Sequence, residues 1–446
     1  MINEPSCQLF KSPLNAIVKT IRKAIPKLIE NYKTELKFSS KEDAEMSTAF
    51  FDDLIVLDHT RYLTGGYPTL LMADLGCEVI KIEELTKGDF CRHEFPFKNN
   101  MGSHFVAIGR NKKSLTLDLK SEEGKEIYLR LAAQADVVVE NYRAGTMDKL
   151  GIGYEEVRKL NPKIIHCSIT GFGKNDDRSR KALHDCNLQA LSGFQDINQG
   201  KTTPLHLCDL STAMVASQAI LAALCQRSKT GEGTYCDVRM FDSFVWWQAL
   251  LYQRWQFNGY SQTFNDIEYP AVAYNYYTTK DGRKYSIGMV EKKFFEIFCR
   301  EQGVEELIDC HLKRQWEAPE AFEKMEVLFK SRTFNEWEEW FSTQDICSAP
   351  VLTIDEAVDY LTSNNPDLVN YVLFPATGET LQVNSPHHIE SIPMNLDEAT
   401  PPPVLGENTA EILFRLGFSE AEVAKFLKEK VCTCSPFLND TTDHVA

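Results

Sequence analysis

Short apolar runs alternate with helical segments over the first half of the chain, and this alternation restricts the fold more than any other feature of the sequence. The runs lie at Leu54–Leu57, Glu78–Ile82, Ser114–Leu119, Asp136–Glu140 and Ile164–Ile169. Buried parallel strands have near-continuous apolar sequences, and helices connect one strand to the next. The sequence therefore predicts an α/β fold with a large parallel sheet. Gly65-Gly66 is expected to break the chain before a helix at 67–76, and a further helix is expected at 122–135.

The second half of the chain has a different pattern. Residues 205–260 are predicted to be helical, and residues 274–290 form a predicted β-hairpin that turns at Lys280–Arg283. Helices are expected at 292–302 and 318–343, an extended segment at 372–383, and two short helices within 407–430.

The first fifty residues form a region of their own. Between Lys11 and Lys37 there are seven basic residues and two acidic ones, and apolar residues recur there at helical spacing. The pattern predicts a basic amphipathic helix, interrupted near Pro26 and followed by a polar linker. Such a helix can lie on an anionic membrane, but we favour docking on the protein's own body or on a second subunit.

Length, charge and cysteine usage exclude several classes of protein. The chain has 446 residues, which favours two domains. A net charge of −16 disfavours bulk nucleic-acid binding. No apolar run is expected to span a membrane, since Ala213–Leu224 is too short. The 13 cysteines lack the spacing of a zinc site, and no signal peptide is evident, so a reducing cytoplasm is predicted.

Familiar nucleotide and hydrolase motifs are absent from the sequence. It has no GxGxxG after the first strand, no P-loop, no HExxH and no GxSxG. The remaining candidates for chemistry are His184, Asp185, Asp209 and Glu291. Each is weak alone, because a single histidine near an apolar stretch is more often a packed and hydrogen-bonded side chain.

An ordered set of motifs changes that assessment. The motifs are Leu57–Tyr67, Ala73–Glu83, Gly88–Asp89, Arg110–Lys120, Ala135–Gly145, Leu150–Tyr154, Asn161–Ile165, Ser168–Gly173, Lys229–Gly233 and Pro402–Thr409. Together they resemble the class III CoA-transferase family over residues 52–430. That family includes formyl-CoA and carnitine CoA-transferases and alpha-methylacyl-CoA racemase. Each motif is weak, but the ordered set is specific.

The resemblance implies a Rossmann-like parallel-sheet domain built from both chain ends, a smaller α+β middle domain and an interlocked homodimer. The expected boundaries are 51–235 for the first part of the large domain, 236–268 for a helical linker, 269–375 for the small domain and 376–446 for the return. The implied ligand is an acyl-CoA thioester, with no metal or redox cofactor. Residues matching the family's CoA-contacting stretches are Leu117, Lys120, Asn141, Tyr142, Arg143 and Lys149. Lys120 and Lys149 are equally compatible with solvated surface charges.

The family contains two chemistries, and the resemblance assigns different roles to the same residues. In transferases an aspartate attacks the thioester and forms a mixed anhydride; Asp185 aligns with that nucleophile. In racemases a histidine and an aspartate act on opposite faces of the carbon next to the thioester. His184 and Asp209 occupy those positions, and Glu291 resembles a glutamate held against the histidine. The segment Leu183–Asn187 is closer to the racemase form.

Other features favour a transferase. The long stretch 83–109, which contains Gly88-Asp89 and Arg92, is typical of transferases, and Leu183 replaces a glycine of the racemases. Tyr269-Pro-Ala-Val also replaces their Gly-Gly-Ala-Pro, although no glycine-rich loop follows residue 240. We favour inversion at C2 of a 2-methyl-branched acyl-CoA. The alternatives are CoA transfer between carboxylic acids and a non-catalytic CoA-binding paralogue.

Overall fold

The computed structural model describes residues 51–259, 270–390, 392 and 395–435. The helix predicted within residues 11–37 lies outside this range. The described chain divides into two compact units. One contains the residues up to Leu183, Leu207–Ser243 and those from Asn370 onward, and the other contains His184–His206 and Phe244–Val369.

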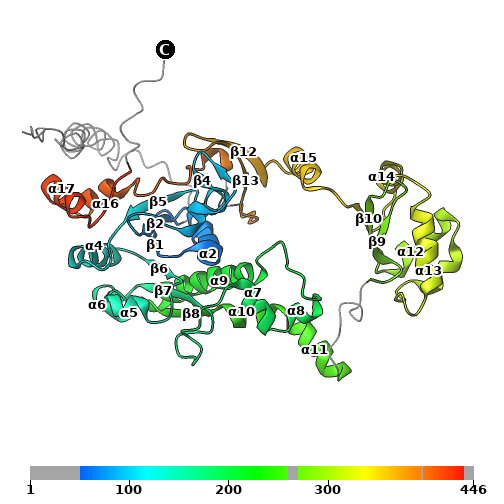
Figure 1. Cartoon of the computed structure of the whole chain (residues 1–446), viewed down its shortest axis with the longest axis horizontal. Helices are drawn as coiled ribbons and strands as arrows, with labels where there is room; N and C mark the ends of the chain where they lie inside the picture. Colours follow the sequence, from blue (N-terminus) through cyan, green and yellow to red (C-terminus); the bar gives the residue numbers. More distant parts are fainter. Residues whose placement is uncertain (1–50, 260–269, 391, 393–394, 436–446) are drawn as a thin grey trace, which may run out of the picture. The chain divides into compact units, whose positions relative to one another are not determined.

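A six-stranded parallel sheet forms the centre of the first unit (Figure 1). Its strands, in spatial order, are β5 (Lys112–Thr116), β2 (Glu78–Glu83), β1 (Ile55–Asp58), β6 (Val137–Glu140), β7 (Ile165–Thr170) and β8 (Tyr235–Arg239). In chain order these strands lie as 3-2-1-4-5-6, the doubly wound arrangement in which the direction of winding reverses between the first and fourth strands. The predicted α/β class with a large parallel sheet is confirmed.

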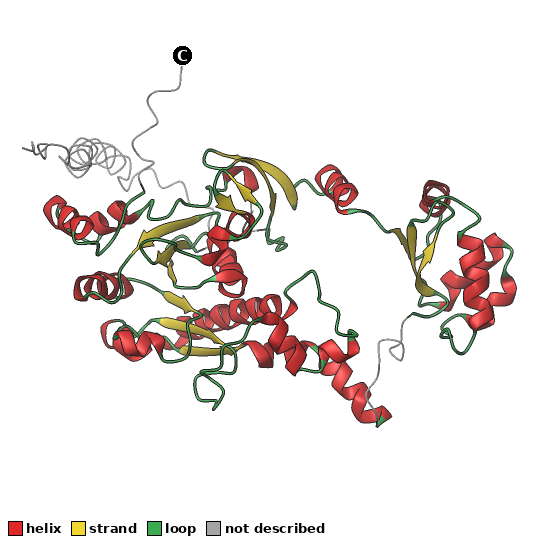
Figure 2. Ribbon diagram, in the orientation of Figure 1, coloured by secondary structure: helices red, strands yellow, loops and turns green. Residues whose placement is uncertain are grey.

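Helices cover both faces of this sheet (Figure 2). One apolar core joins Leu57, Ile80 and Leu115 to α4 (Glu122–Ala132), α6 (Tyr154–Leu160), α16 (Thr409–Arg415) and α17 (Glu420–Lys428). On the opposite face, Val56 and Val79 pack with α2 (Tyr62–Asp74) and α9 (Leu207–Thr230). Adjacent strand residues thus point to opposite cores, which explains the continuous apolar runs.

Helix α9 corrects the expectation that no segment is long enough to span a membrane. By length and composition alone, its 24 residues qualify. Its apolar character has another physical reason, because Ala216, Ile220 and Ala223 are buried in the core beside β7 and β8.

Helix α2 corrects the predicted break at Gly65-Gly66. The helix begins at Tyr62 and includes both glycines, which are buried. A Cβ at Gly65 would lie 2.2 Å from Thr60 Cβ, and one at Gly66 would lie 2.3 Å from Ile108 Cδ1. The glycines therefore permit close packing instead of ending the helix.

The chain end completes the first unit. Asp118 N donates to Val431 O at 2.8 Å, and Ser114 N donates to Asn408 Oδ1 at 3.0 Å. The remaining elements of this unit are η1 (Phe90–His93), β3 (Phe97–Lys98), β4 (Met101–Gly102), α3 (Ser103–Ile108), α5 (Thr146–Leu150), β12 (Val369–Phe374), β13 (Gly378–Val383) and η4 (Leu396–Glu398). β12 reaches back one residue across the division between the units. A large domain built from both chain ends was expected, and the first unit is composed in this way.

The second unit contains short helices and a small antiparallel sheet. Its elements are α7 (Asp185–Leu191), α8 (Phe194–Ile197), α11 (Ala249–Asn258), β9 (Tyr274–Thr278), β10 (Lys284–Gly288), α12 (Lys292–Gln302), η3 (Glu305–Cys310), α13 (Pro319–Phe329), α14 (Phe334–Ser342), β11 (Ser348–Pro350) and α15 (Ile354–Asn364). α10 (Met240–Trp247) crosses the division between the units. The hairpin predicted at residues 274–290 is present as β9 and β10.

Two further predictions in this part were wrong in detail. The single segment expected at 318–343 is two helices, because the chain turns at Lys330–Thr333 and Thr333 caps α14. The helical region expected at 205–260 contains β8, which pairs with β7.

Candidate functional site

The carboxyl ends of β1 and β6 lie side by side, at the point where the winding of the sheet reverses. Open α/β sheets bind their ligands at this position. Arg61 N donates to Asn141 Oδ1 at 2.9 Å, and Asn141 Nδ2 donates to Arg61 O at 2.7 Å. Asn141 was predicted from the sequence, and here it fixes the backbone that follows β1.

The Arg61 side chain was not selected from the sequence. Its guanidinium carbon lies 5.2 Å from the ring centre of Phe90 and 5.5 Å from that of Tyr142. The site therefore presents a cation close to two aromatic rings, a combination suited to a phosphate and to a planar base. Its position directly after the first strand is the signal that would have identified it.

A buried charge cluster supports this loop from beneath. Asp58 Oδ2 lies 3.5 Å from Lys81 Nζ and 3.2 Å from Lys112 Nζ, and Lys81 Nζ lies 2.7 Å from Asp89 Oδ2. Burial alone would raise the pKa of Asp58, but the two lysines and the Thr60 hydroxyl hold it below its usual range. Lys81 also donates to Thr60 O at 2.8 Å, so the cluster fixes the start of the loop.

Buried titratable groups lie next to the same loop. Burial lowers the pKa of His59 to about 3, so its imidazole is neutral. Burial raises the pKa of Glu140 to about 7, although Ser168 and the Tyr142 amide donate to its carboxylate and oppose that rise. Neither group was selected from the sequence.

The other predicted CoA contacts are in different environments. Tyr142 is half-buried beside Arg61, whereas Lys120, Arg143 and Lys149 are exposed. Leu117 is buried in the apolar core, and its amide donates to Glu83 O at 2.9 Å.

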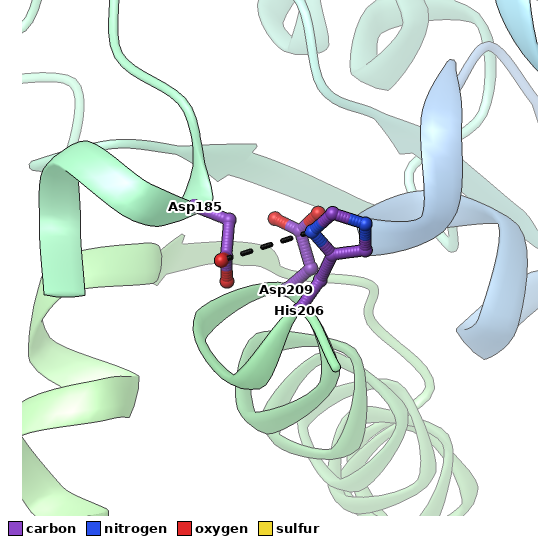
Figure 3. Close-up of side chains that lie close together, drawn as sticks. All are labelled: Asp185, His206 and Asp209. Carbon is purple, nitrogen blue, oxygen red and sulfur yellow. Dashed lines mark ion pairs between the residues drawn. The ribbon is translucent and has the colours of Figure 1, made fainter. Parts of the chain in front are cut away.

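His184 and Asp185 begin α7 in the second unit. His184 is the exposed N-cap residue, and its amide donates to Asn187 Oδ1 at 2.9 Å. Asp185 is buried, and its Oδ2 accepts from Gln189 Nε2 at 2.6 Å. Figure 3 shows that Asp185 faces His206, whose Nδ1 lies 3.8 Å from Asp185 Oδ2. Carboxylate and imidazole groups are also ligand types for a divalent cation, so this pair can supply two ligands.

His206 was quoted in the sequence only as a neighbour of Asp209. Its side chain is 54% exposed, which leaves the ring accessible while it faces Asp185. Sequence reasoning did not select it, because its partner lies 21 positions away.

Asp209 lies in the first turn of α9, in the first unit. The Thr64 hydroxyl donates to Asp209 Oδ1 at 2.7 Å, which orients the half-buried carboxylate. The N-terminal end of a long helix stabilises a negative charge there. Glu291, in the second unit, is exposed and forms the N-cap of α12.

Comparisons with known proteins agree on one family. A family model described as CoA-transferase family III matches residues 51–409. Mouse succinyl-CoA:glutarate CoA-transferase is 32% identical over 386 residues, covering 83% of this chain and 88% of that protein. Mouse alpha-methylacyl-CoA racemase is 29% identical over 377 residues, covering 82% and 93%. The crystal structure of a CaiB/BaiF family protein from Brucella suis superposes with a TM-score of 0.71 at 25% identity, covering 81% and 98%.

Proposed function

Because the chain belongs to CoA-transferase family III, we propose that it inverts C2 of a 2-methyl-branched acyl-CoA thioester. The observation that carries this proposal is the presence of acid/base residues on two short segments. His184 and Asp185 begin α7, and Asp209 lies in the first turn of α9, with His206 directly before that helix. Imidazole accepts and donates protons near neutral pH, which suits a reversible reaction.

In the proposed mechanism, His184 and Asp209 act on opposite faces of C2. One removes the C2 proton, the electron pair of that C–H bond forms the enolate of the thioester, and the other returns a proton to the opposite face. The exposure of His184 and the orientation of Asp209 by Thr64 support these roles. Glu291 is proposed to tune His184. The reaction requires no metal or redox cofactor.

Asp185 is better suited to positioning than to attack. Its side chain is 10% exposed, Gln189 donates to it, and His206 faces it. We therefore assign Asp185 and His206 to the support of α7 and its His184.

The coenzyme part of the substrate is proposed to bind at the switch point of the sheet. Arg61 offers a cation for phosphate, and Tyr142 and Phe90 offer ring faces for the adenine. Arg143 and Lys149, which are exposed, add cations near the same strand end in the sequence.

CoA transfer is the second candidate function, and the 32% identity to succinyl-CoA:glutarate CoA-transferase favours it. Asp185 was predicted to be the nucleophile of that reaction. Its burial favours Asp209 instead, because Asp209 is more accessible and is already oriented by a hydroxyl. Asp209 would then serve either chemistry.

The test uses the purified full chain in deuterium oxide with (2R)-2-methylacyl-CoA and no acceptor acid. Loss of the C2 proton signal together with loss of chirality supports inversion. If the C2 proton does not exchange and CoA moves to added carboxylic acids, the protein is a CoA-transferase and the inversion proposal is wrong. Binding of the thioester without either reaction, across a panel of acyl chains and acceptors, makes the protein a CoA-binding paralogue.

Variants separate the proposed roles. His184→Ala and Asp209→Asn are expected to lower the exchange rate by about 100-fold or more, whereas Asp185→Asn retains a measurable rate. Asp196→Asn, at an exposed position of α8, is the matched control. If Asp185→Asn is inactive and His184→Ala remains active, the assignment of His184 as an acid/base residue is wrong.

We also propose that the protein is a homodimer. The support is a group of exposed apolar residues on α10 and α11, which would be covered by a partner: Trp246, Trp247, Leu250, Trp255 and Phe257.

A further inference from the structure

A surface groove of about 700 Å³ is lined by α4, by the end of α5 and by the end of α6. Its apolar lining includes Leu129, Leu150 and Leu160. Leu129 and Leu150 pack partly on the core beneath, and Leu160 is 53% exposed. The groove therefore presents leucine side chains to whatever covers α4.

The charged lining of the groove comes from α4 and contains three glutamates and two basic residues. The glutamates are Glu122, Glu123 and Glu126, and the basic residues are Lys125 and Arg130. Glu122 pairs with Lys125 at 2.8 Å and Glu126 pairs with Arg130 at 2.6 Å, both within the helix. Ion pairs of this exposed kind contribute little to stability, so the glutamates can exchange their partners for cations on a docking segment.

The chain itself contains a segment with the complementary pattern. Residues 11–37 have seven basic and two acidic residues, a net charge of +5, whereas the remaining residues carry −16 − 5 = −21. Leu14, Ile17 and Ile21 belong to an apolar stripe at helical spacing. An apolar stripe with basic flanks can pack on the leucines and pair with the glutamates beside them.

The position at which the described chain begins also favours this segment. Ile55 N donates to Asp136 Oδ2 at 2.9 Å, and Asp136 follows Ala133, which lines the groove, by three residues. Residues 38–50 connect the segment to the described chain. Thirteen extended residues span about 40 Å, so the linker can reach the groove.

We propose that residues 11–37 dock in the groove between α4 and α6 of the same chain, with their apolar stripe on Leu129, Leu150 and Leu160. Their lysines face the glutamates of α4. This inference is independent of the reaction proposed above, because it uses none of the residues assigned to catalysis.

Zero-length carbodiimide cross-linking of the full-length protein tests the proposal, with mass spectrometry of the peptides. The expected products join Lys19, Lys23 or Lys27 to Glu122, Glu123 or Glu126. Cross-links from these lysines mainly to other carboxylates overturn the proposal. A mixture of ¹⁴N- and ¹⁵N-labelled protein identifies the chain of origin, and products that join the two labels also overturn it.

Substitutions on both partners complete the test. Ile21→Glu, on the apolar stripe, and Leu160→Asn, in the groove, are each expected to lower the cross-link yield about tenfold, because each removes an apolar contact. Thr20→Glu is the control for the segment, and Leu191→Asn, at a residue 52% exposed on α7, is the control for the groove. Equal losses in the controls contradict specific docking.

Membrane binding is the competing result. Vesicles with anionic lipid are added to the full-length protein at physiological salt. If the vesicles sediment the protein, and Ile21→Glu abolishes sedimentation while the cross-links to α4 are absent without vesicles, the segment is a membrane anchor and the proposal fails.

Discussion

Single buried groups determine how the switch point responds to pH. Glu140 ends β6 and is almost completely enclosed, and its carboxylate accepts hydrogen bonds from Ser168 and from the Tyr142 amide. Burial disfavours the charged form of a carboxyl group, so the folded state is destabilised when Glu140 loses its proton. The strand end that carries Asn141 and Tyr142 is therefore sensitive to the state of one proton.

Glu140→Gln is expected to change the dependence of stability on pH. The pKa of Glu140 is about 7 in the folded protein and 4.5 without its surroundings. Between these values the unfolded chain releases a proton that the folded chain keeps, so stability falls as pH rises from 4.5 to 7. Above pH 7 the loss in the free energy of unfolding is constant. At about 1.4 kcal/mol per pKa unit this loss is ~3 kcal/mol. Urea unfolding at pH 5, 6, 7 and 8 measures the effect.

Glu140→Gln should be more stable than the natural chain at pH 8. The difference in the free energy of unfolding between the two proteins should be smallest near pH 5. His59 acts in the opposite direction, since its lowered pKa makes stability fall as pH drops below 6.5. The comparison must therefore be between the two proteins at each pH. The same difference at all four pH values contradicts the assignment.

Arg61→Met is expected to weaken binding of acyl-CoA. A lost hydrogen bond to a charged phosphate costs about 1.5–3 kcal/mol, which corresponds to a rise of about 10- to 150-fold in KM. The Asn141 contacts use the backbone of Arg61, so they remain in the variant. Steady-state kinetics with an unchanged thermal midpoint check the result, and Arg300→Met, at an exposed position of α12, is the control. An unchanged KM for Arg61→Met removes this residue from the coenzyme site.

At the scale of elements, α2 shows why local sequence rules gave the wrong boundary. Two adjacent glycines usually mark a turn. Here Gly65 lies against Thr60 and Gly66 lies against Ile108, so the absence of side chains serves tertiary packing. The packing partner of Gly66 is 42 residues away and cannot be inferred from local propensity.

Gly65→Ala should therefore destabilise the protein, although alanine favours helices. The added methyl group meets Thr60 Cβ, which belongs to the loop held by Lys81 and cannot move freely. The expected loss is about 1–3 kcal/mol in the free energy of unfolding, as for other overpacked sites. Gly171→Ala is the control, because its nearest contact is 4.0 Å away. Stabilisation by Gly65→Ala would contradict the packing argument.

The sequence was informative for elements that are apolar throughout. The five predicted strands of the large sheet are present, and the family resemblance is confirmed by the match to residues 51–409. β8 was missed because this edge strand mixes exposed and half-buried polar residues, including Asp237 and Arg239. In the site, Asn141 and Tyr142 could be found from a motif, and Arg61 from its position directly after the first strand. His206 could not be found, because its partner Asp185 lies 21 positions away in the sequence.

At the scale of the whole molecule, exposed aromatic residues predict self-association. Trp255 is 57% and Phe257 is 85% exposed on α11, and large apolar side chains grouped on a surface indicate that a partner covers it. Light scattering after gel filtration is expected to give twice the chain mass of 50.8 kDa. The double variant Trp255→Ser/Phe257→Ser should shift the protein toward monomer, whereas Tyr371→Ser, exposed on β12, should not. A monomeric natural chain overturns the homodimer.

The return of the chain end to the first strands also determines when the core can be completed during translation. Asp118 bonds to Val431, and the core around Ile127 and Tyr128 is closed by Ile412, Leu413 and Phe426. A ribosome adds about 5–20 residues per second, so the early strands wait about 15–60 s for these partners. During that interval one face of the sheet is packed by α4 and α6 but lacks α16 and α17. The incomplete chain therefore exposes apolar surface for many seconds before it can finish folding. The yield of folded protein is expected to depend on chaperones, even if the completed fold is stable.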